Sequence, residues 1–261
     1  TGPQYAWYFP QVSRATQACS PVDTEIYPEL ENFPQTRFSK SHAFSGFQME
    51  TSVCAGARGI TMNIFDMMGN GVLPEEGYAR LLAGRKDFLD LVQGLGLRQD
   101  RQTGVKVLFS PQASYSLQTT AGASMDELYP EETFWASLLT SFSVANTLQG
   151  GGVPKGDIVA ISGQYLRNLE RAAIEELFAR NFVLLDGEAA NTLLGLGLGR
   201  LAGMRAAEWM RPDDGRHAYE EVCNGRLYAG IPQLRIGVQG SAGSYLRIDY
   251  EIRPDLFTSV K

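Results

Sequence analysis

The sequence contains few of the residues from which metal centres, disulfide frameworks and redox sites are built. Its 261 residues include three cysteines and two histidines. The cysteines (Cys19, Cys54 and Cys223) lie far apart without a Cys-x-x-Cys motif, so buried free thiols are the simplest interpretation. The histidines, His42 and His217, have no constellation of catalytic partners near them in the sequence. We therefore expect no metal site, no cofactor and no histidine catalysis.

Long apolar runs and an excess of basic charge are also absent. No segment is apolar over the length of a membrane span, and no basic region opens the chain. The net charge is -6, and the lysines and arginines are scattered along the sequence. This distribution argues against a nucleic-acid or membrane partner and suits a neutral substrate. The composition predicts a soluble globular protein with room for two modest domains, while the compartment, bacterial cytoplasm or secreted, is left open.

Residues 22–66 have the pattern of a strand, a helix and a second strand, with the strands expected over 22–31 and 59–66. Ser39 is a candidate N-cap for the helix between them. The polar residues near the two strand ends are Glu29, Glu31, Asn63 and Asp66. A βαβ unit is typical of parallel sheets, whose catalytic groups lie at the carboxyl ends of the strands. We therefore expect a convergent polar rim at these two strand ends.

Two flanking segments complete this N-terminal part. Residues 1–21 are rich in aromatic and turn residues and are expected to be loop-like. Pro74, followed by two glutamates, favours the start of an amphipathic helix that ends near residue 95. One strand-helix-strand unit precedes the change of pattern near residue 104, and one unit cannot close a barrel. We therefore expect this chain to be the C-terminal piece of a larger enzyme.

From residue 105 the pattern alternates between strands and helices. Strands are expected over 105–111, 157–162 and 182–186, and helices over 131–148, 169–180 and 188–194. This alternation predicts a doubly wound, flavodoxin-like sheet. Ser162 follows a strand, but no Gly-x-Ser-x-Gly motif surrounds it, so we assign it no catalysis. Segments 233–238 and 245–252 alternate with a period of two, which predicts antiparallel strands.

Three motifs occur in an order that resembles one family of enzymes. They are Pro28-Glu29-Leu30-Glu31-Asn32-Phe33-Pro34 with Lys40-Ser41, Gly56-Ala57-Arg58-Gly59-Ile60 leading into Asn63-Ile64-Phe65-Asp66, and Leu184-Leu185-Asp186-Gly187-Glu188-Ala189-Ala190. Their order is similar to that of the β-galactosidase-like, TIM-barrel glycoside hydrolases of families 42 and 164, several of which assemble as trimers. The resemblance covers most of the chain but lacks the first six strands of the barrel.

The resemblance implies an α/β fold of three parts. Residues 1–103 would be the last two βα units of a (β/α)8 barrel, residues 104–212 a flavodoxin-like trimerisation domain, and residues 213–261 an antiparallel β segment. In this family a glutamate at the end of the seventh barrel strand is the nucleophile, and one on the fourth strand is the acid/base. The chain would then be a fragment of a retaining hydrolase of β-glycosides that carries the nucleophile and lacks the acid/base.

Glu31, two residues before Phe33 and Pro34, best matches the nucleophile position, and Glu29, on the same strand face, is its rival. Supporting roles at the site are assigned to Arg37, Lys40, Asn63, Asp66 and Trp7. A cation at Arg37 or Lys40 would keep the nucleophile ionised, Asn63 and Asp66 would bind sugar hydroxyls, and Trp7 would stack on the sugar.

Each of these residues also has a plain structural interpretation. The acidic pair could cap the next helix or solvate a loop, the cations could be surface residues, Asn63 and Asp66 could cap a turn, and Trp7 could belong to the core. The alternative function is therefore a non-catalytic carbohydrate-binding or oligomerisation module. Under either hypothesis we expect a homo-oligomer, a trimer or a dimer, because open strand edges are paired or covered in proteins.

Overall fold

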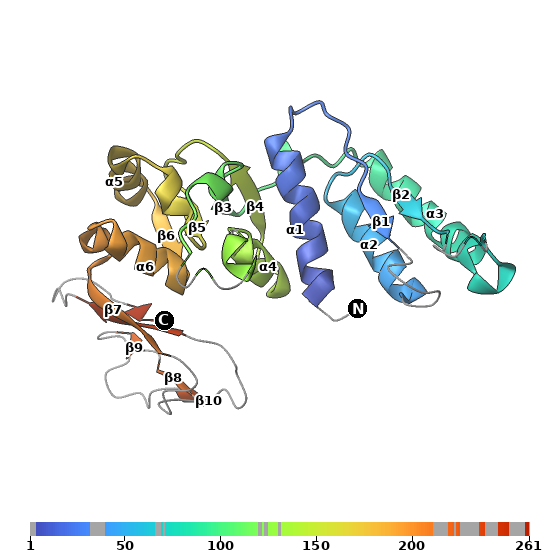
Figure 1. The fold of residues 1–261 in the computed structure, drawn as a ribbon. Coiled ribbons are helices and arrows are strands. Elements are labelled where there is room, and N and C mark those ends of the chain that lie inside the picture. Colours follow the sequence, from blue (N-terminus) through green and yellow to red (C-terminus); the bar gives the residue numbers. More distant parts are fainter. Residues whose placement is uncertain are drawn as a thin grey trace. The chain divides into compact units, whose positions relative to one another are not determined.

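The computed structural model describes residues 4–31, 40–65, 69, 71–119, 122, 125–129, 132–210, 219–221, 223–224, 235–237, 245–250 and 259–260. These residues form a mixed α/β structure with parallel and antiparallel strand pairs (Figure 1). The chain divides into two compact units, one made of Thr1–Pro111 and Thr133–Gly152 and the other of Gln112–Glu132 and Val153–Lys261. The predicted boundaries at residues 103 and 212 stay a prediction.

The first element is a helix, α1 (Gln4–Cys19). The sequence predicted a loop over residues 1–21, and this prediction was wrong for most of that segment. Pro10 lies inside the helix. Proline has no N–H for the helical hydrogen bond and normally ends or kinks a helix, so local sequence rules argue against one here. Tertiary contacts outweigh this local cost.

Buried hydrogen bonds hold α1 in place. The Arg14 side chain is 7% exposed and donates to Gln11 Oε1 at 2.8 Å and to Asn146 Oδ1 at 2.9 Å. It also donates to the main-chain carbonyl of Asn146. Asn146 is the first residue of strand β4 (Asn146–Gly150), so one guanidinium ties the helix to a distant strand.

The predicted βαβ unit is present. Strands β1 (Glu29–Glu31) and β2 (Thr61–Asn63) pair in parallel, and helix α2 (His42–Cys54) lies between them in the chain. Both strands are shorter than predicted. Ser41 caps α2 by accepting a hydrogen bond from the Phe44 N–H at 3.2 Å, whereas the predicted cap, Ser39, lies outside the described residues.

The two faces of β1 differ in burial. Leu30 is 1% exposed, while Glu29 and Glu31 on either side of it are exposed. In the parallel register Glu29 pairs with Thr61 and Glu31 pairs with Asn63. Because alternate residues of a strand point to opposite faces, both carboxylates share one open face of the sheet with Thr61 and Asn63.

The chain after β2 forms a short 3-10 helix, η1 (Pro74–Glu76), and then the predicted amphipathic helix, α3 (Tyr78–Gly94). Tyr78 and Leu81 form a buried cluster against Ile64, so the first turns of α3 pack on the residues that follow β2. Further along α3, Leu91 remains 65% exposed.

The next part of the same unit holds the parallel pair β3 (Val105–Phe109) and β4, with α4 (Phe134–Ser141) between them in the chain. A single helix was predicted over residues 131–148, and this was wrong beyond residue 141. The chain leaves the helix through Ser143, whose φ is 56°, and then enters β4. β4 begins with Asn146 and ends with Gly150, two residue types that are depleted in strands, so the segment gave no clear strand signal.

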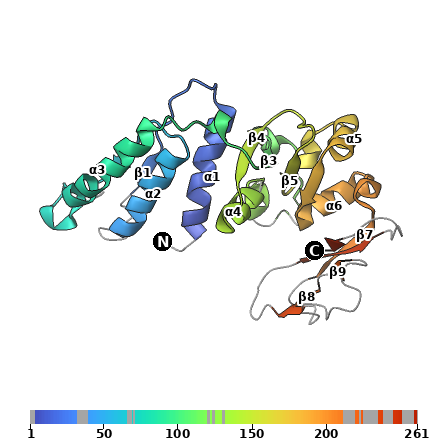
Figure 2. The ribbon, with the colours of Figure 1, turned by 180° about the vertical axis from the view of Figure 1, so that it is seen from behind.

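In the second unit, β5 (Ile158–Ile161) pairs in parallel with β6 (Phe182–Leu185). Helix α5 (Arg171–Arg180) connects these strands, and α6 (Gly187–Gly195) follows β6 (Figure 2). These four elements confirm the predicted alternation to within about two residues at each end. Val159, Ala160 and Ile161 are 0% exposed, so β5 is part of the buried core of the unit.

The C-terminal segment contains short antiparallel pairs. They are β7 (Met204–Met210) with β11 (Tyr245–Tyr250), β8 (Tyr219–Glu221) with β10 (Arg235–Gly237), and β9 (Cys223–Asn224) with β12 (Ser259–Val260). Further 3-10 helices are η2 (Gln99–Arg101), η3 (Ala113–Tyr115), η4 (Met125–Leu128), η5 (Tyr165–Asn168) and η6 (Gly199–Ala202). The predicted antiparallel strands are therefore confirmed where the structure describes them. None of the described helices combines the length and the apolarity that a membrane crossing requires.

Candidate functional site

Three of the predicted site residues meet at the carboxyl ends of β1 and β2. The Asn63 Nδ2 group donates a hydrogen bond to Glu31 Oε2 at 3.2 Å, and Lys40 Nζ donates to the main-chain carbonyl of Glu31 at 2.8 Å. The side-chain oxygen of Asn63 accepts from the Phe65 N–H at 3.3 Å, which directs its amino group toward Glu31. The Glu31 carboxylate is thus oriented by a neighbour while it remains open to solvent.

Lys40 is 8% exposed, which is unusual for a lysine. Its ammonium nitrogen lies 5.6 Å from the centroid of the Phe44 ring. Burial lowers the pKa of Lys40 to about 8, and the negative charge of Glu31 acts in the opposite direction. Below that pH Lys40 therefore carries a positive charge, partly shielded from water, beside the end of β1.

Glu29 lies on the same open face but is differently placed. It makes no hydrogen bond or ion pair with any residue that the structure describes. The carboxylate of Glu31 therefore has a defined orientation, and that of Glu29 does not.

The remaining predicted site residues stay predictions. Arg37 and Asp66 lie outside the described residues. The main chain of Trp7 belongs to α1, but its side chain is not among the described ones. In the described ranges, no group of three or more His, Cys, Asp or Glu side chains is placed so that it could hold a metal ion.

The carboxyl ends of β5 and β6 carry a second set of polar residues, in the other unit. Asp186 Oδ2 accepts from the Gly163 N–H at 3.0 Å, and Asp186 Oδ1 accepts from the Ala189 N–H at 2.7 Å. Ser162 is 0% exposed. Asp186 thus serves as the N-cap of α6. Both oxygens of its carboxylate accept hydrogen bonds from main-chain N–H groups of the protein.

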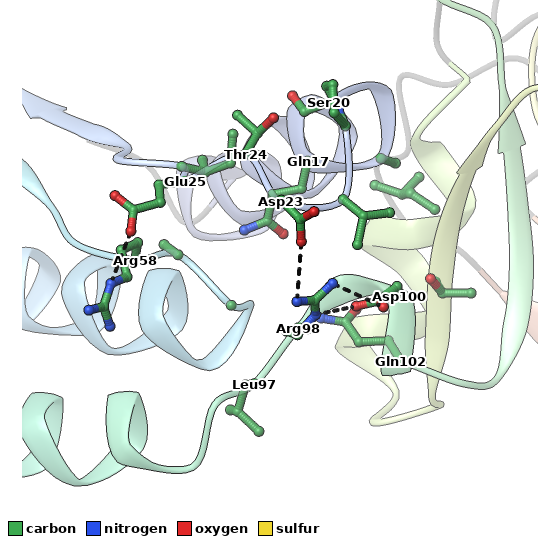
Figure 3. Close-up of a pocket in the computed structure, with 18 of the residues that line it drawn as sticks. Gln17, Ser20, Asp23, Thr24, Glu25, Arg58, Leu97, Arg98, Asp100 and Gln102 are labelled. Atoms are coloured by element: carbon green, nitrogen blue, oxygen red, sulfur yellow. Dashed lines mark hydrogen bonds and ion pairs between the residues drawn. The ribbon is translucent and has the colours of Figure 1, made fainter.

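A cavity of about 580 Å³ lies in the first unit (Figure 3). Its walls come from residues 20–26 ahead of β1, residues 56–58 ahead of β2, residues 96–102 after α3, and β4. The cavity is therefore at the amino ends of β1 and β2, whereas Glu31 and Asn63 are at their carboxyl ends. In parallel α/β proteins the amino ends are usually associated with stability rather than catalysis.

Ion pairs join charged side chains that line this cavity. Arg98 Nη1 is 3.7 Å from Asp23 Oδ1, and Arg98 Nε is 2.9 Å from Asp100 Oδ1, as Figure 3 shows. The hydrogen bond from Arg98 lowers the pKa of Asp100. A second pair joins Arg58 Nε to Glu25 Oε1 at 3.4 Å. None of these residues was predicted as part of a site, although Arg98 and Asp100 are a local charge pair that the sequence displays.

Comparisons of this chain with models of protein families, with curated proteins and with solved structures found no match. A functional assignment therefore depends on the geometry of the sites. Candidate sites include the oriented Glu31 carboxylate at the strand ends and the polar cavity at the opposite ends of the same strands.

Proposed function

We propose that Glu31 is the nucleophile of a retaining glycoside hydrolase that acts on β-glycosides. The observation that carries this proposal is the hydrogen bond between Glu31 and Asn63 at the carboxyl ends of two parallel strands. This is the end of the sheet at which barrel enzymes place their catalytic groups. The open face of β1 leaves the carboxylate accessible to a substrate.

The chemistry assigned to Glu31 is nucleophilic displacement at the anomeric carbon. One carboxylate oxygen forms an ester bond to that carbon while the bond from the carbon to the leaving-group oxygen breaks. Asn63 donates to Oε2, so Oε1 is the oxygen left for attack. A carboxylic acid on another strand protonates the leaving oxygen, and a water molecule then cleaves the ester with that same residue acting as base.

Glu31 is a better nucleophile candidate than Glu29 because of its surroundings. It has the Asn63 amide on its carboxylate and the Lys40 ammonium on its main-chain carbonyl, whereas Glu29 has neither. A nearby positive charge favours an ionised carboxylate in general. We assign Arg37 to the same electrostatic role, and Asp66 and Trp7 to binding the sugar.

The proposal includes a larger fold. β1 and β2 would be the last two strands of a (β/α)8 barrel within residues 1–103, and residues 104–212 would be a flavodoxin-like domain that forms a trimer or dimer. The parallel pairs β3–β4 and β5–β6, each with an intervening helix, support the second assignment. A barrel requires eight strands, so the other six and the acid/base carboxyl group would come from outside this sequence.

A second candidate function is a non-catalytic assembly module. Ile158 and Phe182 are register partners at the start of β5 and β6, and they are 49% and 79% exposed. Adjacent large apolar side chains on a surface favour contact with another protein. This observation concerns the second unit and is compatible with either function.

Trapping of the covalent intermediate tests the proposal. An activated 2-deoxy-2-fluoro glycoside should label an enzyme that contains this sequence and a complete barrel, and peptide mass mapping should place the sugar on Glu31. Labelling of Glu29, or of a residue outside β1, would reject the assignment. The isolated chain should show no useful turnover of a nitrophenyl glycoside, because general acid–base assistance is worth about 10²–10⁴-fold.

A further inference from the structure

Strand β6 has one open edge. It lies beside β5 (Figure 1) and pairs with that strand alone among the described strands. The N–H of Phe182 donates to the Asp157 carbonyl at 3.0 Å. Because successive residues of a strand direct their main-chain groups to opposite sides, those of Phe182 and Leu184 face β5. The main-chain groups of Val183 and Leu185 therefore face the open edge, where water or another strand can pair with them.

The side chains along this edge are apolar. Phe182 is 79% exposed, and Val183, Leu184 and Leu185 are partly exposed. Edge strands of natural sheets commonly carry charged residues, prolines or bulges, which prevent pairing with another chain. β6 contains no charged residue and no proline, and its register with β5 is regular. The strand is short, but nothing in its sequence opposes the addition of a further strand.

Charges of opposite sign flank β6 and indicate which strand fits this edge. Arg180 is the last residue of α5, before the strand, and Glu188 lies in the first turn of α6, after it. Arg180 is exposed, and its ion pair with Glu176 is a surface contact within one helix, which is worth little. A partner strand should therefore carry negative charge beside Arg180 and positive charge beside Glu188. A second β6 in antiparallel orientation meets both conditions, whereas a parallel one would bring like charges together.

We propose that two copies of this chain pair through β6, as antiparallel strands related by a two-fold axis. In one register Val183 lies opposite Leu185 of the second copy, and the two exchange main-chain hydrogen bonds in both directions. Leu184 then lies opposite its own counterpart, so the cross-strand neighbours within β6 are apolar. Such an interface uses the same patch on both copies and closes as a dimer. The inference does not rest on the proposed role of Glu31, which belongs to the other unit.

Amide hydrogen exchange of the original chain, measured at several protein concentrations, tests the pairing directly. Sedimentation should show a monomer and a dimer in equilibrium with a Kd of about 10–100 μM, because a short strand pair makes a small interface. The Val183 and Leu185 N–H groups should become protected from exchange as the dimer forms. The Leu184 N–H, which faces β5, is the internal control and should be protected at every concentration.

A reversal of charge tests the orientation of the two strands. Arg180→Glu should weaken the dimer at least about tenfold, because it places like charges together at both ends of the strand pair. Combining it with Glu188→Arg should restore the dimer. The matched control is Arg171→Glu at the opposite end of α5, where Arg171 pairs with Glu175 of its own helix. This variant should dimerise as the original chain does.

Four results would overturn the proposal. The first is a strict monomer, or a trimer, over the whole range of concentrations. The second is a dimer in which Val183 and Leu185 exchange as fast as in the monomer. The third is equal dimerisation of Arg180→Glu and Arg171→Glu. The fourth is a double variant that circular dichroism shows to be folded but that does not regain the dimer.

Discussion

Asn63 donates a hydrogen bond to the Glu31 carboxylate across 3.2 Å, and the two residues are direct partners in the parallel register of β1 and β2. The pairing of the strands therefore determines which side chain orients the carboxylate. Thr61, the register partner of Glu29, instead donates from its hydroxyl group to the Pro28 carbonyl at 3.3 Å. This difference between two adjacent positions distinguishes Glu31 from Glu29.

Asn63→Ala should reduce kcat/KM for an activated glycoside by about tenfold in an enzyme with a complete barrel, because one orienting hydrogen bond is lost. Thr61→Val is the control, since it changes the same face of β2 at the position opposite Glu29. Steady-state kinetics of the two variants measure the change in kcat/KM for each. Equal rates for Asn63→Ala and the unaltered enzyme would remove Asn63 from the site.

Lys40 should make the stability of this chain depend on pH above neutrality. Its pKa is about 8 in the folded chain and about 10.4 when unfolded. Between these values the unfolded chain binds more protons than the folded one, so the free energy of unfolding rises with pH. Below pH 8 both states are protonated, and the cost of burying the charge is fully present.

Urea denaturation of the original chain and Lys40→Met at pH 7 and pH 10 measures this effect. The difference in unfolding free energy between the two should shift in favour of the original chain by up to about 3 kcal/mol at the higher pH. Lys86→Met is the control, because Lys86 is exposed and its hydrogen bond to Asp90 raises its pKa. A pH-independent difference for Lys40→Met would show that Lys40 is not buried as a cation.

Arg14→Met should destabilise the first unit by about 2–4 kcal/mol, because the buried oxygens of Asn146 lose their donor. Burial lowers the pKa of Arg14, and no described carboxylate is paired with it. Arg80→Met is the matched control on an exposed part of α3 and should change stability by no more than about 0.5 kcal/mol. Equal effects in chemical denaturation would show that Arg14 does not hold α1 on β4.

Sequence patterns predicted the elements with a strong local signal and missed those held by distant contacts. The apolar runs at β3 and β5 identified these strands. Helix α1 was missed because Pro10 opposes it locally, while the Arg14 contacts that hold it reach residue 146. Strand β4 was missed because its polar residues satisfy no period-two pattern, and its position is determined by pairing with β3.

Gly104→Ala tests the close approach of the main chain just before β3 to the main chain just before β4. Gly104 has a φ of +125°, and a Cβ there would lie 2.1 Å from the Ala145 carbonyl oxygen. The substitution should destabilise the chain by more than about 3 kcal/mol. Gly84→Ala, in an open position of α3, should instead stabilise it by about 0.5–1 kcal/mol. Thermal unfolding measures both variants. An unchanged melting temperature for Gly104→Ala would contradict this part of the fold.

The candidate site was predictable in part. The sequence predicted that Glu29 and Glu31 lie on the same face near the end of a strand. It also predicted that Asn63 lies near the end of the neighbouring strand. The hydrogen bond from Asn63 to Glu31 did not, because it depends on a register between residues 32 positions apart. The contact of Lys40 with the Glu31 carbonyl likewise depends on the path of the chain after β1.

Chemical rescue of Glu31→Ala is the most direct test of the central claim that Glu31 is the nucleophile. In an enzyme with a complete barrel, this variant should lose turnover of an activated β-glycoside, and added azide should restore part of the rate with an α-glycosyl azide as product. Glu29→Ala should lose less activity and show no rescue. Rescue of Glu29→Ala instead, or of neither variant, would contradict the assignment.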